Sequence, residues 1–485
     1  MSVTASISNA LSGLTAAARA AELVSANVAN ASTEGYGTRN LKTSAASVGG
    51  VGAGVRIDGV TRSIDQAVLA DRRAADADLF FDSNVASYHA RIQSAIGLPG
   101  EDGSLADVLV GFESALVDAA SRPDQAVRLD AVAAAAVSLA QKMNSVSDAV
   151  QAERQAAETE ILRQVENLNT DLRQVADLNA DIAVQKARGN DALALMDQRQ
   201  VVIDRISGVV PVSVLPRDSG QVALISSGGG VLLDGTAATL GFTPVNMIGP
   251  EMTVSGGALS QVTFNGQPVD MARTTNMLQG GALDALFSIR DDLSLATQEA
   301  LDGLATEVLT RFSDPAVDAS LSFGMPGIFT DAGAAFDPAL ATGLSQRIAV
   351  NVSIDPAIGG QSWRLRDGIG AANPGSPGDA RQLRAFIDTL SEARVPASSA
   401  LGSEEQSIFA ISSHVLSQTG LASQRAEQQL AFSTARWEAL RVVELEGAVN
   451  TDAEMQKLLL IEQAYAANAR VLESINEMLD ALTRI

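Results

Sequence analysis

The sequence predicts a mainly α-helical protein with a β-rich outer region and nested domains. Regularly spaced apolar residues at both ends of the chain predict terminal helices that form an inner coiled coil. Similar spacing between the ends predicts a helical-bundle stalk. A central block of β-branched residues separated by glycine turns predicts a β-rich insertion. Aromatic residues make up only 4% of the 485 residues, a composition that suits close-packed helices better than a large sandwich core.

Near the N-terminus, apolar residues alternate spacings of four and three. The row comprises Val3, Ile7, Ala10, Leu14, Ala17, Ala21, Val24, Val28 and Ala31. An average period of 3.5 residues is typical of a coiled-coil seam, and its alanines would let a partner helix approach closely.

A matching row lies near the C-terminus. Its members are Leu458, Ile461, Tyr465, Asn468, Leu472, Ile475, Leu479 and Leu482, and Met455, Leu459, Val471, Met478 and Ile485 widen the apolar stripe. Thr451 and Glu454 predict a capping box at the start of this helix. Residues 1–60 carry four basic and three acidic residues, whereas 446–485 carry three basic and seven acidic ones. This asymmetry favours pairing of the two ends, or of neighbouring copies.

Between the ends, helices are expected at 129–143, at 161–182, from about 190 to 207, and at 281–313, 379–392 and 404–445. The sequence "ARGN" (187–190) is expected to break the second of these, and Asn190 or Asp191 to cap the next. Hairpins are expected over 207–268. We predict three domains: 1–60 plus 446–485 (terminal helices), 61–206 plus 277–318 plus 380–445 (helix bundle), and 207–276 plus 319–379 (β-rich).

The charge and residue usage exclude several classes of function. A net charge of −23 argues against general nucleic-acid binding and against docking on an anionic membrane. The absence of cysteine excludes disulfides, thiolate metal sites and cysteine nucleophiles. We also expect no membrane span and no cleaved signal peptide, so export would use another route.

No catalytic, metal or cofactor site is expected. His89 and His414 stand in helical surroundings without a metal-binding spacing. The acidic clusters "DAD" (76–78), "RDD" (290–292) and "SEE" (403–405) are interpreted as solvated helix faces. "SSGGG" (226–230) is interpreted as a hairpin turn, and "DPAVDAS" (314–320) lacks the acidic ladder of a calcium loop.

The stretch "ANVANASTEGYGTRN" (26–40) is interpreted as a joint after the first helix. Asn30 to Thr33 are expected to end that helix, Gly35 to adopt a left-handed turn, and Tyr36 to offer its ring to a neighbour. A phosphate cradle is rejected because no lysine accompanies the loop and no strand precedes it.

The N-terminal and C-terminal segments of the chain resemble the paired motifs of bacterial flagellar rod, hook and hook-associated proteins. The N-terminal resemblance lies in "SISNALSGLTAAARAAELVSANVANASTEGYGTRN", with Glu34 where relatives commonly have proline. The C-terminal resemblance includes Gln463, Tyr465, Ala467 and Ala469. "NLNTDLRQVADLNADI" and "GNDALALMDQRQVVIDRIS" resemble the helical middle of the hook–filament junction members.

The resemblance implies a structural, non-enzymatic subunit of the flagellum, exported through its type III apparatus. It also implies as partners further copies of the chain, the hook protein, the second junction protein, and an export chaperone on the C-terminal helix. Two alternatives stay open: a hook or rod subunit, and a scaffold-borne cell-wall hydrolase. The expected assembly contacts are Val3, Ile7, Leu14, Val24, Val28, Tyr36, Leu458, Ile461, Tyr465, Leu472, Ile475, Leu479 and Leu482.

Overall fold

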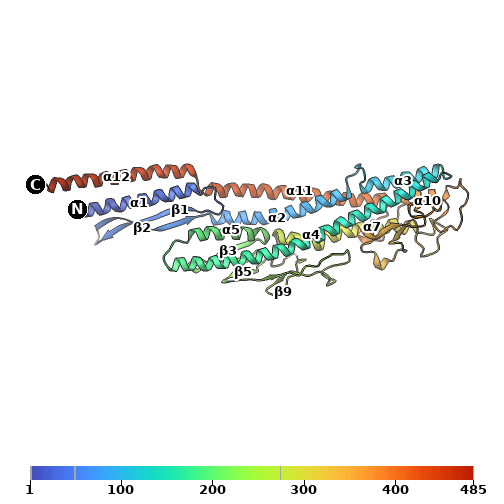
Figure 1. The fold of residues 1–485 in the computed structure, drawn as a ribbon, viewed down its shortest axis with the longest axis horizontal. Coiled ribbons are helices and arrows are strands. Elements are labelled where there is room, and N and C mark those ends of the chain that lie inside the picture. Colours follow the sequence, from blue (N-terminus) through green and yellow to red (C-terminus); the bar gives the residue numbers. More distant parts are fainter. Residues whose placement is uncertain (1–2, 49–50, 274, 484–485) are drawn as a thin grey trace. The chain divides into compact units, whose positions relative to one another are not determined.

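A computed structural model describes residues 3–48, 51–273 and 275–483, and the described chain is mainly α-helical, as predicted (Figure 1). It divides into two compact units. Unit 1 holds residues 1–79, 167–239 and 433–485, and unit 2 holds 80–166 and 240–432. The predicted three-domain partition stays a prediction.

Helices form most of both units. They are α1 (Val3–Ala29), α2 (Gln66–Ile96), α3 (Leu105–Ser121), α4 (Ala126–Ala187), α5 (Leu193–Val209), α6 (Gly281–Ser288), α7 (Ser294–Phe312), α8 (Leu344–Arg347), α9 (Arg364–Asp367), α10 (Arg381–Ser391), α11 (Ile408–Gly447) and α12 (Thr451–Thr483). A π-helical turn, Ile289–Leu293, joins α6 to α7. Short 3₁₀ turns occur at Asp218–Gly220, Pro338–Leu340, Pro356–Ile358 and Ser399–Leu401.

Within the described residues, the strands form four small antiparallel sheets. A hairpin pairs β1 (Thr38–Val48) with β2 (Val51–Ser63). A four-stranded sheet has the order β3 (Val212–Pro216), β4 (Val222–Ser226), β5 (Val231–Asp234) and β6 (Thr236–Ala237). A three-stranded sheet joins β7 (Leu240–Gly241), β8 (Thr263–Phe264) and β9 (Gln267–Pro268), and β10 (Phe329–Asp331) pairs with β11 (Ile348–Val350).

Periodicity located the long helices correctly. The expected helices at 129–143 and 161–182 are parts of α4, which ends at Ala187, two residues before Gly189 with a φ of +73°. The heptad-like row Ile161, Val165, Leu168, Leu172, Val175 and Ile182 is buried throughout. The predicted cap of α5 is wrong, because its N-cap position is Ala192, which makes no side-chain cap hydrogen bond. Asp191, one residue earlier, accepts from the Leu193 N–H at 2.8 Å. The predicted hairpins at 217–220 and 227–230 also form.

Two expectations about strands are wrong. Residues 38–48 and 51–60, expected within the terminal helical domain, belong to the β1–β2 hairpin, whose alternating small and polar residues carry little helical signal. Region 319–379, expected to be β-rich, contains only β10 and β11 among its described strands and consists mainly of turns and short helices. Its proline and glycine residues break helices and strands alike.

Unit 2 has an aromatic core. Phe112, Phe312 and Phe329 pack mutually edge-to-face, with ring centroids 5.7 Å apart, and Phe386 adds a tilted contact to Phe312. All four rings are fully buried. Helix α3, which supplies Phe112, begins at the cap Ser104, whose side chain accepts from the Asp107 N–H. Among the described residues, no helix combines the length and apolarity that a bilayer crossing demands.

Candidate assembly surface

The two terminal helices pack against each other in unit 1, as predicted for the inner coiled coil (Figure 1). Gly13 of α1 lies against the Asn468 side chain, because a Cβ on Gly13 would come 2.7 Å from Asn468 Nδ2. Asn27, about four helical turns further along α1, meets Glu454 at the start of α12. The pair is therefore antiparallel, and Asn468, the polar member of the C-terminal row, sits where a glycine makes room.

The predicted contact residues lie mainly between these two helices. Val24 and Ile475 are buried at 5% and 4% exposure. Tyr465 is exposed at 48%, and the side chain of Leu482 lies outside the described residues. The other nine are partly buried, namely Val3, Ile7, Leu14, Val28, Tyr36, Leu458, Ile461, Leu472 and Leu479. Their role between subunits stays a prediction.

Helix α12 also exposes large apolar side chains that α1 does not cover. Exposure ranges from 47% to 65% for the six large residues Met455, Leu459, Leu460, Tyr465, Val471 and Met478. Single exposed apolar residues are ordinary, but six on one 33-residue helix form a surface that favours a further partner.

Near the C-terminal end of α1, Asn27 connects three segments of the chain. Its Nδ2 donates to the Arg39 carbonyl at 2.9 Å and to Glu454 Oε2 at 3.0 Å. Its Oδ1 accepts from the Tyr36 hydroxyl at 2.9 Å and from the Arg39 N–H at 3.0 Å. Asn27 and Glu454 are 1% and 2% exposed, so these bonds replace water that neither group can reach. Lys457 Nζ pairs with the other Glu454 oxygen at 2.5 Å.

An ion-paired aspartate on α5 holds the loop after α1. Asp197 Oδ1 lies 2.6 Å from Arg62 Nε, and its Oδ2 lies 3.3 Å from Arg39 Nη2. The Gly37 N–H also donates to Asp197, at 3.2 Å. Arg62 further donates to the Gly35 carbonyl at 3.0 Å and to Gln200 Oε1 at 2.5 Å. The loop is thus fixed to α5 and β2 at the same point.

Both glycines of the Gly-Tyr-Gly sequence are needed for this fit. Gly35 has a φ of +75°, which confirms the predicted left-handed turn, and a Cβ there would lie 2.6 Å from Val201 Cγ2. A Cβ on Gly37 would lie 2.6 Å from Arg62 Cγ. Helix α1 ends at Ala29, as expected for a stop within Asn30 to Thr33.

The Tyr36 side chain is engaged within the chain rather than directed outward. Its hydroxyl donates to Asn27, and the Arg39 guanidinium lies 5.0 Å from its ring centroid, within range of a cation–π contact. Burial raises the pKa of the Tyr36 phenol, and the nearby Arg39 charge partly opposes that rise. The phenol is therefore a neutral donor within the chain, and its predicted contact with a neighbouring copy stays a prediction.

Sequence reasoning missed Asn27, Glu454 and Asp197 as the residues that build the joint. Glu454 was assigned to a capping box, but the cap is Asn450, whose Oδ1 accepts from the Ala453 N–H at 3.0 Å. An available signal was the position of Glu454 among the apolar row of α12, four residues before Leu458. A carboxylate on a buried face requires a partner, although the pattern does not identify it.

A second charged cluster corrects the interpretation of "DAD" as solvated. Asp76 is buried, accepts from Trp437 Nε1 at 2.5 Å and pairs with Arg72. Arg72 also reaches Asp204 of α5 at 2.7 Å and Glu444 of α11 at 3.1 Å. Burial raises the pKa of Asp76, against the opposing effect of Arg72. These charges join three helices of unit 1.

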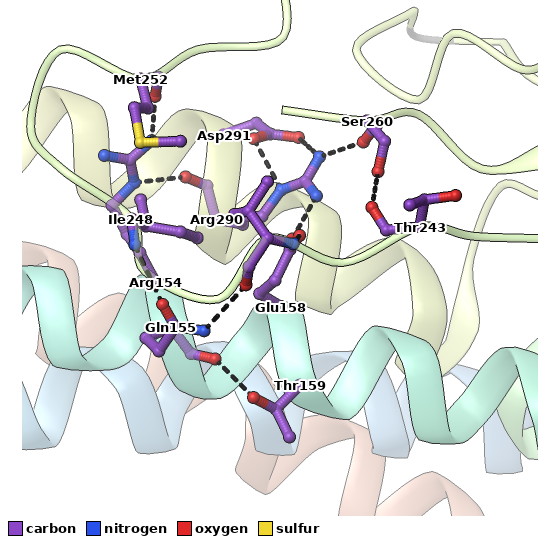
Figure 2. Close-up of polar contacts among 11 residues, drawn as sticks. Arg154, Gln155, Glu158, Thr159, Thr243, Ile248, Met252, Ser260, Arg290 and Asp291 are labelled. Carbon is purple, nitrogen blue, oxygen red and sulfur yellow. Dashed lines mark hydrogen bonds and ion pairs between the residues drawn. The ribbon is translucent and has the colours of Figure 1, made fainter. Parts of the chain in front are cut away.

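The "RDD" cluster was also misjudged as solvated. Figure 2 shows Arg290 between Glu158 and Asp291 in unit 2, at 2.5 Å and 2.7 Å respectively. Arg290 and Glu158 are fully buried, and Arg290 stacks near Phe287 at 4.9 Å. Arg154 Nε donates to the Arg290 carbonyl at 3.1 Å (Figure 2). The group fixes the segment 245–260 onto α4. For example, the Val245 N–H donates to Glu158 Oε1 at 2.9 Å.

The third acidic cluster, "SEE" (403–405), is exposed, as predicted.

The remaining candidate sites hold backbone in place. Asp318 of "DPAVDAS" is fully buried and accepts from the Ser320 and Ile369 N–H groups. His89 and His414 lie on α2 and α11. Within the described residues, His, Asp and Glu side chains form no group of three or more that could hold a metal ion.

Three family profiles match the chain. Residues 90–316 match the helical domain of flagellar hook-associated protein FlgK, residues 7–36 match flagella basal body rod protein, and residues 447–485 match the C-terminal segment of flagellar basal body rod FlgEFG protein. The two terminal matches coincide with the α1 joint and with α12.

Individual proteins are similar over different lengths. Flagellar hook-associated protein 1 of Escherichia coli is 26% identical over 56% of this chain and 54% of its own length. Flagellar hook-associated protein 1 of Bacillus subtilis is 22% identical over 94% of this chain and 92% of its own. The chain therefore spans about half the length of the enterobacterial relatives it matches. A solved flagellar hook junction protein FlgK from Burkholderia pseudomallei aligns with a TM-score of 0.42 and 18% identity, over 56% of this chain and 47% of that one.

Proposed function

The chain belongs to the family of flagellar hook-associated protein 1, and from this premise we propose that it is a structural subunit of the junction between hook and filament. There it would allow the filament to assemble on the hook. The observation that carries the proposal is the conjunction of a junction-type helical domain at 90–316 with rod-type motifs at both ends.

The mechanism is assembly rather than catalysis. The apolar surface that α12 leaves uncovered is buried when subunits meet, which contributes roughly 25 cal/mol per Å² of apolar area. Ordering the contacting segments opposes this gain. An interface that joins unlike surfaces of successive copies does not close on itself and can generate a helical tube.

The proposed partners follow from the position in the flagellum. They are further copies of the chain, the hook protein on one side, the second hook–filament junction protein on the other, and an export chaperone that covers α12 before assembly. Exposed apolar residues on α12 support the chaperone, because such a surface promotes aggregation until it is covered. Export would proceed through the flagellar type III apparatus.

A hook or rod subunit is the second candidate. It is favoured by the rod-type matches at 7–36 and 447–485, which are shared along the flagellar axis. The match of 90–316 to the junction-type helical domain favours the junction assignment instead.

Deletion of the gene tests the proposal. The expected phenotype is hooks without filaments and flagellin released into the medium, visible by electron microscopy and by blotting the culture supernatant. Normal filaments would overturn the junction assignment, and loss of the hooks themselves would favour the hook or rod alternative.

Truncation of residues 458–485 is expected to leave export intact but to abolish incorporation.

A further inference from the structure

A hollow of about 520 Å³ lies in unit 1 beside the Gly-Tyr-Gly sequence. Its walls are the loop 31–36, the segment 63–68 that leads into α2, Gln200 of α5, and the end of α11 with the turn that follows, 441–448. A volume of this size falls within the ordinary range of ligand pockets. All of these walls belong to one compact unit, so that unit alone shapes the hollow.

Gln200 presents an unused hydrogen-bond donor to the hollow. The residue is 7% exposed, and its Oε1 accepts from Arg62 Nη2. Because a guanidinium can only donate, the amide oxygen must face Arg62, and the NH2 group points elsewhere. Among the described residues Nε2 has no acceptor, although Gln200 lines the hollow. A nearly buried donor without a partner favours a ligand that brings a carbonyl oxygen.

The end of α11 offers hydrogen-bond acceptors to the same hollow. Helix α11 ends at Gly447, and the last carbonyls of a helix have no N–H partner from a following turn. The Ala448 N–H donates to the Leu445 carbonyl, and no backbone N–H of the described chain donates to the Glu446 or Gly447 carbonyl. The C-terminus of a helix also carries a partial negative charge. This wall therefore favours N–H groups or a cation.

Unpaired carboxylates lie in the lining as well. Glu34 of the loop and Glu446 of α11 are exposed, and neither forms an ion pair within the described part of the chain. Arg441, the basic residue of the lining, pairs with a different carboxylate of α11 at 3.1 Å. Arg205 of α5, whose charge Glu34 also influences, pairs with Asp171 at 2.7 Å. The hollow is therefore suited to a positively charged ligand and unsuited to an anionic one.

Aliphatic side chains complete the lining of the hollow. Ile64 and Val68 contribute from the segment that leads into α2, and Val443 and Leu445 contribute from α11. The two side chains on α11 are 47% and 54% exposed, so their own chain covers them only in part. An aliphatic group of a ligand placed against them would remove apolar surface from water on both sides, which favours binding.

We propose that this hollow binds an extended peptide segment of another protein, in which an aliphatic residue stands next to a lysine or arginine. A peptide backbone supplies both the carbonyl that the Gln200 amide lacks and N–H groups for the end of α11. The aliphatic side chain packs against Val443 and Leu445, and the basic side chain meets the two unpaired carboxylates. Such binding does not depend on the position of the chain along the flagellum, so it goes beyond the proposed function.

Capped dipeptides of similar size test the chemistry of the ligand. The probes are acetyl-leucyl-lysine amide, acetyl-leucyl-glutamine amide and acetyl-leucyl-glutamate amide, and saturation-transfer NMR on the purified full chain measures their binding. The lysine probe is expected to bind, and the glutamate probe to bind at least about tenfold more weakly, because its charge is repelled by Glu34 and Glu446. The glutamine probe should fall between them. Equal binding of all the probes, or no binding of the lysine probe, would overturn the proposal.

A matched pair of substitutions on α11 locates the bound probe. Glu446 and Glu438 are both exposed, but only Glu446 lines the hollow. Glu446→Lys is expected to weaken binding of the lysine probe by about tenfold, whereas Glu438→Lys should leave it unchanged. Equal thermal unfolding of the two variants shows that the fold is intact. An equal loss in both would mean that only the overall charge of the chain matters, against a defined site.

The Gln200 amide reports directly on the carbonyl of the ligand. Its side-chain NH2 resonances can be identified by their loss in Gln200→Met, and they are expected to shift when the lysine probe is added to the wild type. A bound probe that leaves these resonances in place would lie elsewhere, and the proposal would fail.

Photo-cross-linking in cells tests the occupant. A photoreactive residue in place of Leu445 is expected to link to another protein, through a segment in which mass spectrometry finds an aliphatic residue next to a basic one. The product should disappear when Glu446→Lys is added. Products that contain only copies of this chain, or a linked segment without a basic residue, would contradict the proposed occupant. Normal filaments in the deletion strain would refute the proposed function itself, a separate result.

Discussion

The terminal helix pair of unit 1 and the core of unit 2 differ in how far they bury their large apolar side chains. In unit 2, four phenylalanine rings are fully buried against one another, and even Arg290 has its partners inside the fold. In unit 1, α12 keeps six large apolar residues at 47% exposure or more. Unit 2 thus satisfies its side chains within one chain, whereas α12 of the terminal pair keeps large apolar side chains that α1 does not cover. The comparison separates residues that stabilise the subunit from residues left for contacts.

The largest expected effect is in the buried network of unit 2. Arg290→Met should lower the free energy of unfolding by about 3–5 kcal/mol, because it leaves the buried Glu158 carboxylate without its cation. Urea denaturation measures this change. The double variant Arg290→Met with Glu158→Gln should recover part of the loss, since residue 158 then carries no unpaired charge. A single variant as stable as the wild type would show that the pair contributes little.

Asn27→Ala should lower the free energy of unfolding by less than Arg290→Met does, and its effect should stay local. It removes the acceptor of the Tyr36 hydroxyl and of the Arg39 N–H, and the amide donor to Glu454, with an expected loss of about 1–3 kcal/mol. Hydrogen exchange should accelerate in α1 and α12 while α7 stays protected. Asn30→Ala is the control, because the Asn30 amide donates only to the Ala26 carbonyl among its described acceptors. Faster exchange throughout both units would contradict a local role.

A pair of glycine variants isolates the close approach at the joint. Gly35 and Gly189 have nearly the same φ, +75° and +73°, but a Cβ meets Val201 at Gly35 and open space at Gly189. Both Gly→Ala changes bear the left-handed strain of about 1–2 kcal/mol. Gly35→Ala should cost about 1 kcal/mol more through overpacking. Equal thermal shifts for the two variants would mean that α5 moves aside freely.

The smallest expected effect is a pH dependence in unit 2. Burial lowers the pKa of His89, whose ring packs edge-on against Tyr88. The folded state then binds a proton less readily than the unfolded state, so this contribution is present above about pH 6.5 and is lost as the pH falls. The ring is partly exposed, so the effect should stay below the ~1.4 kcal/mol of a full pKa unit. Comparing melting at pH 7.5 and 5.0, His89→Gln should lose less stability than the wild type, and an equal loss would count against this account.

Periodicity predicted most of the fold because helices repeat their environment every three or four residues. The rows along α1, α4 and α12 are local patterns, and each proved to face another part of the chain. Partners distant in sequence leave no such pattern. Asn27 and Glu454 look like a helix-end amide and a capping acid until the fold places them 3.0 Å apart.

Charged residues were the least predictable part of the candidate site. "RDD" and "SEE" have nearly the same character in the sequence, yet Arg290 is fully buried and Glu404 is exposed. Burial of a charge depends on whether a partner arrives from elsewhere, as Glu158 does for Arg290. Glycines at close contacts are equally hard to predict from sequence. Gly37 leaves room for the Arg62 side chain, which comes from the distant strand β2.

The Asn27–Glu454 hydrogen bond also bears on the order of folding. It joins residues separated by 427 positions, so it forms only after nearly the whole chain is available. Contacts of such long sequence separation close a large loop and are slow to form compared with those within a single helix. The α1–α12 pair, which we call the terminal module, is thus expected to be the last part of a newly exported chain to become ordered. Any chain interrupted between the two helices would lose this module while keeping the local contacts of its helices.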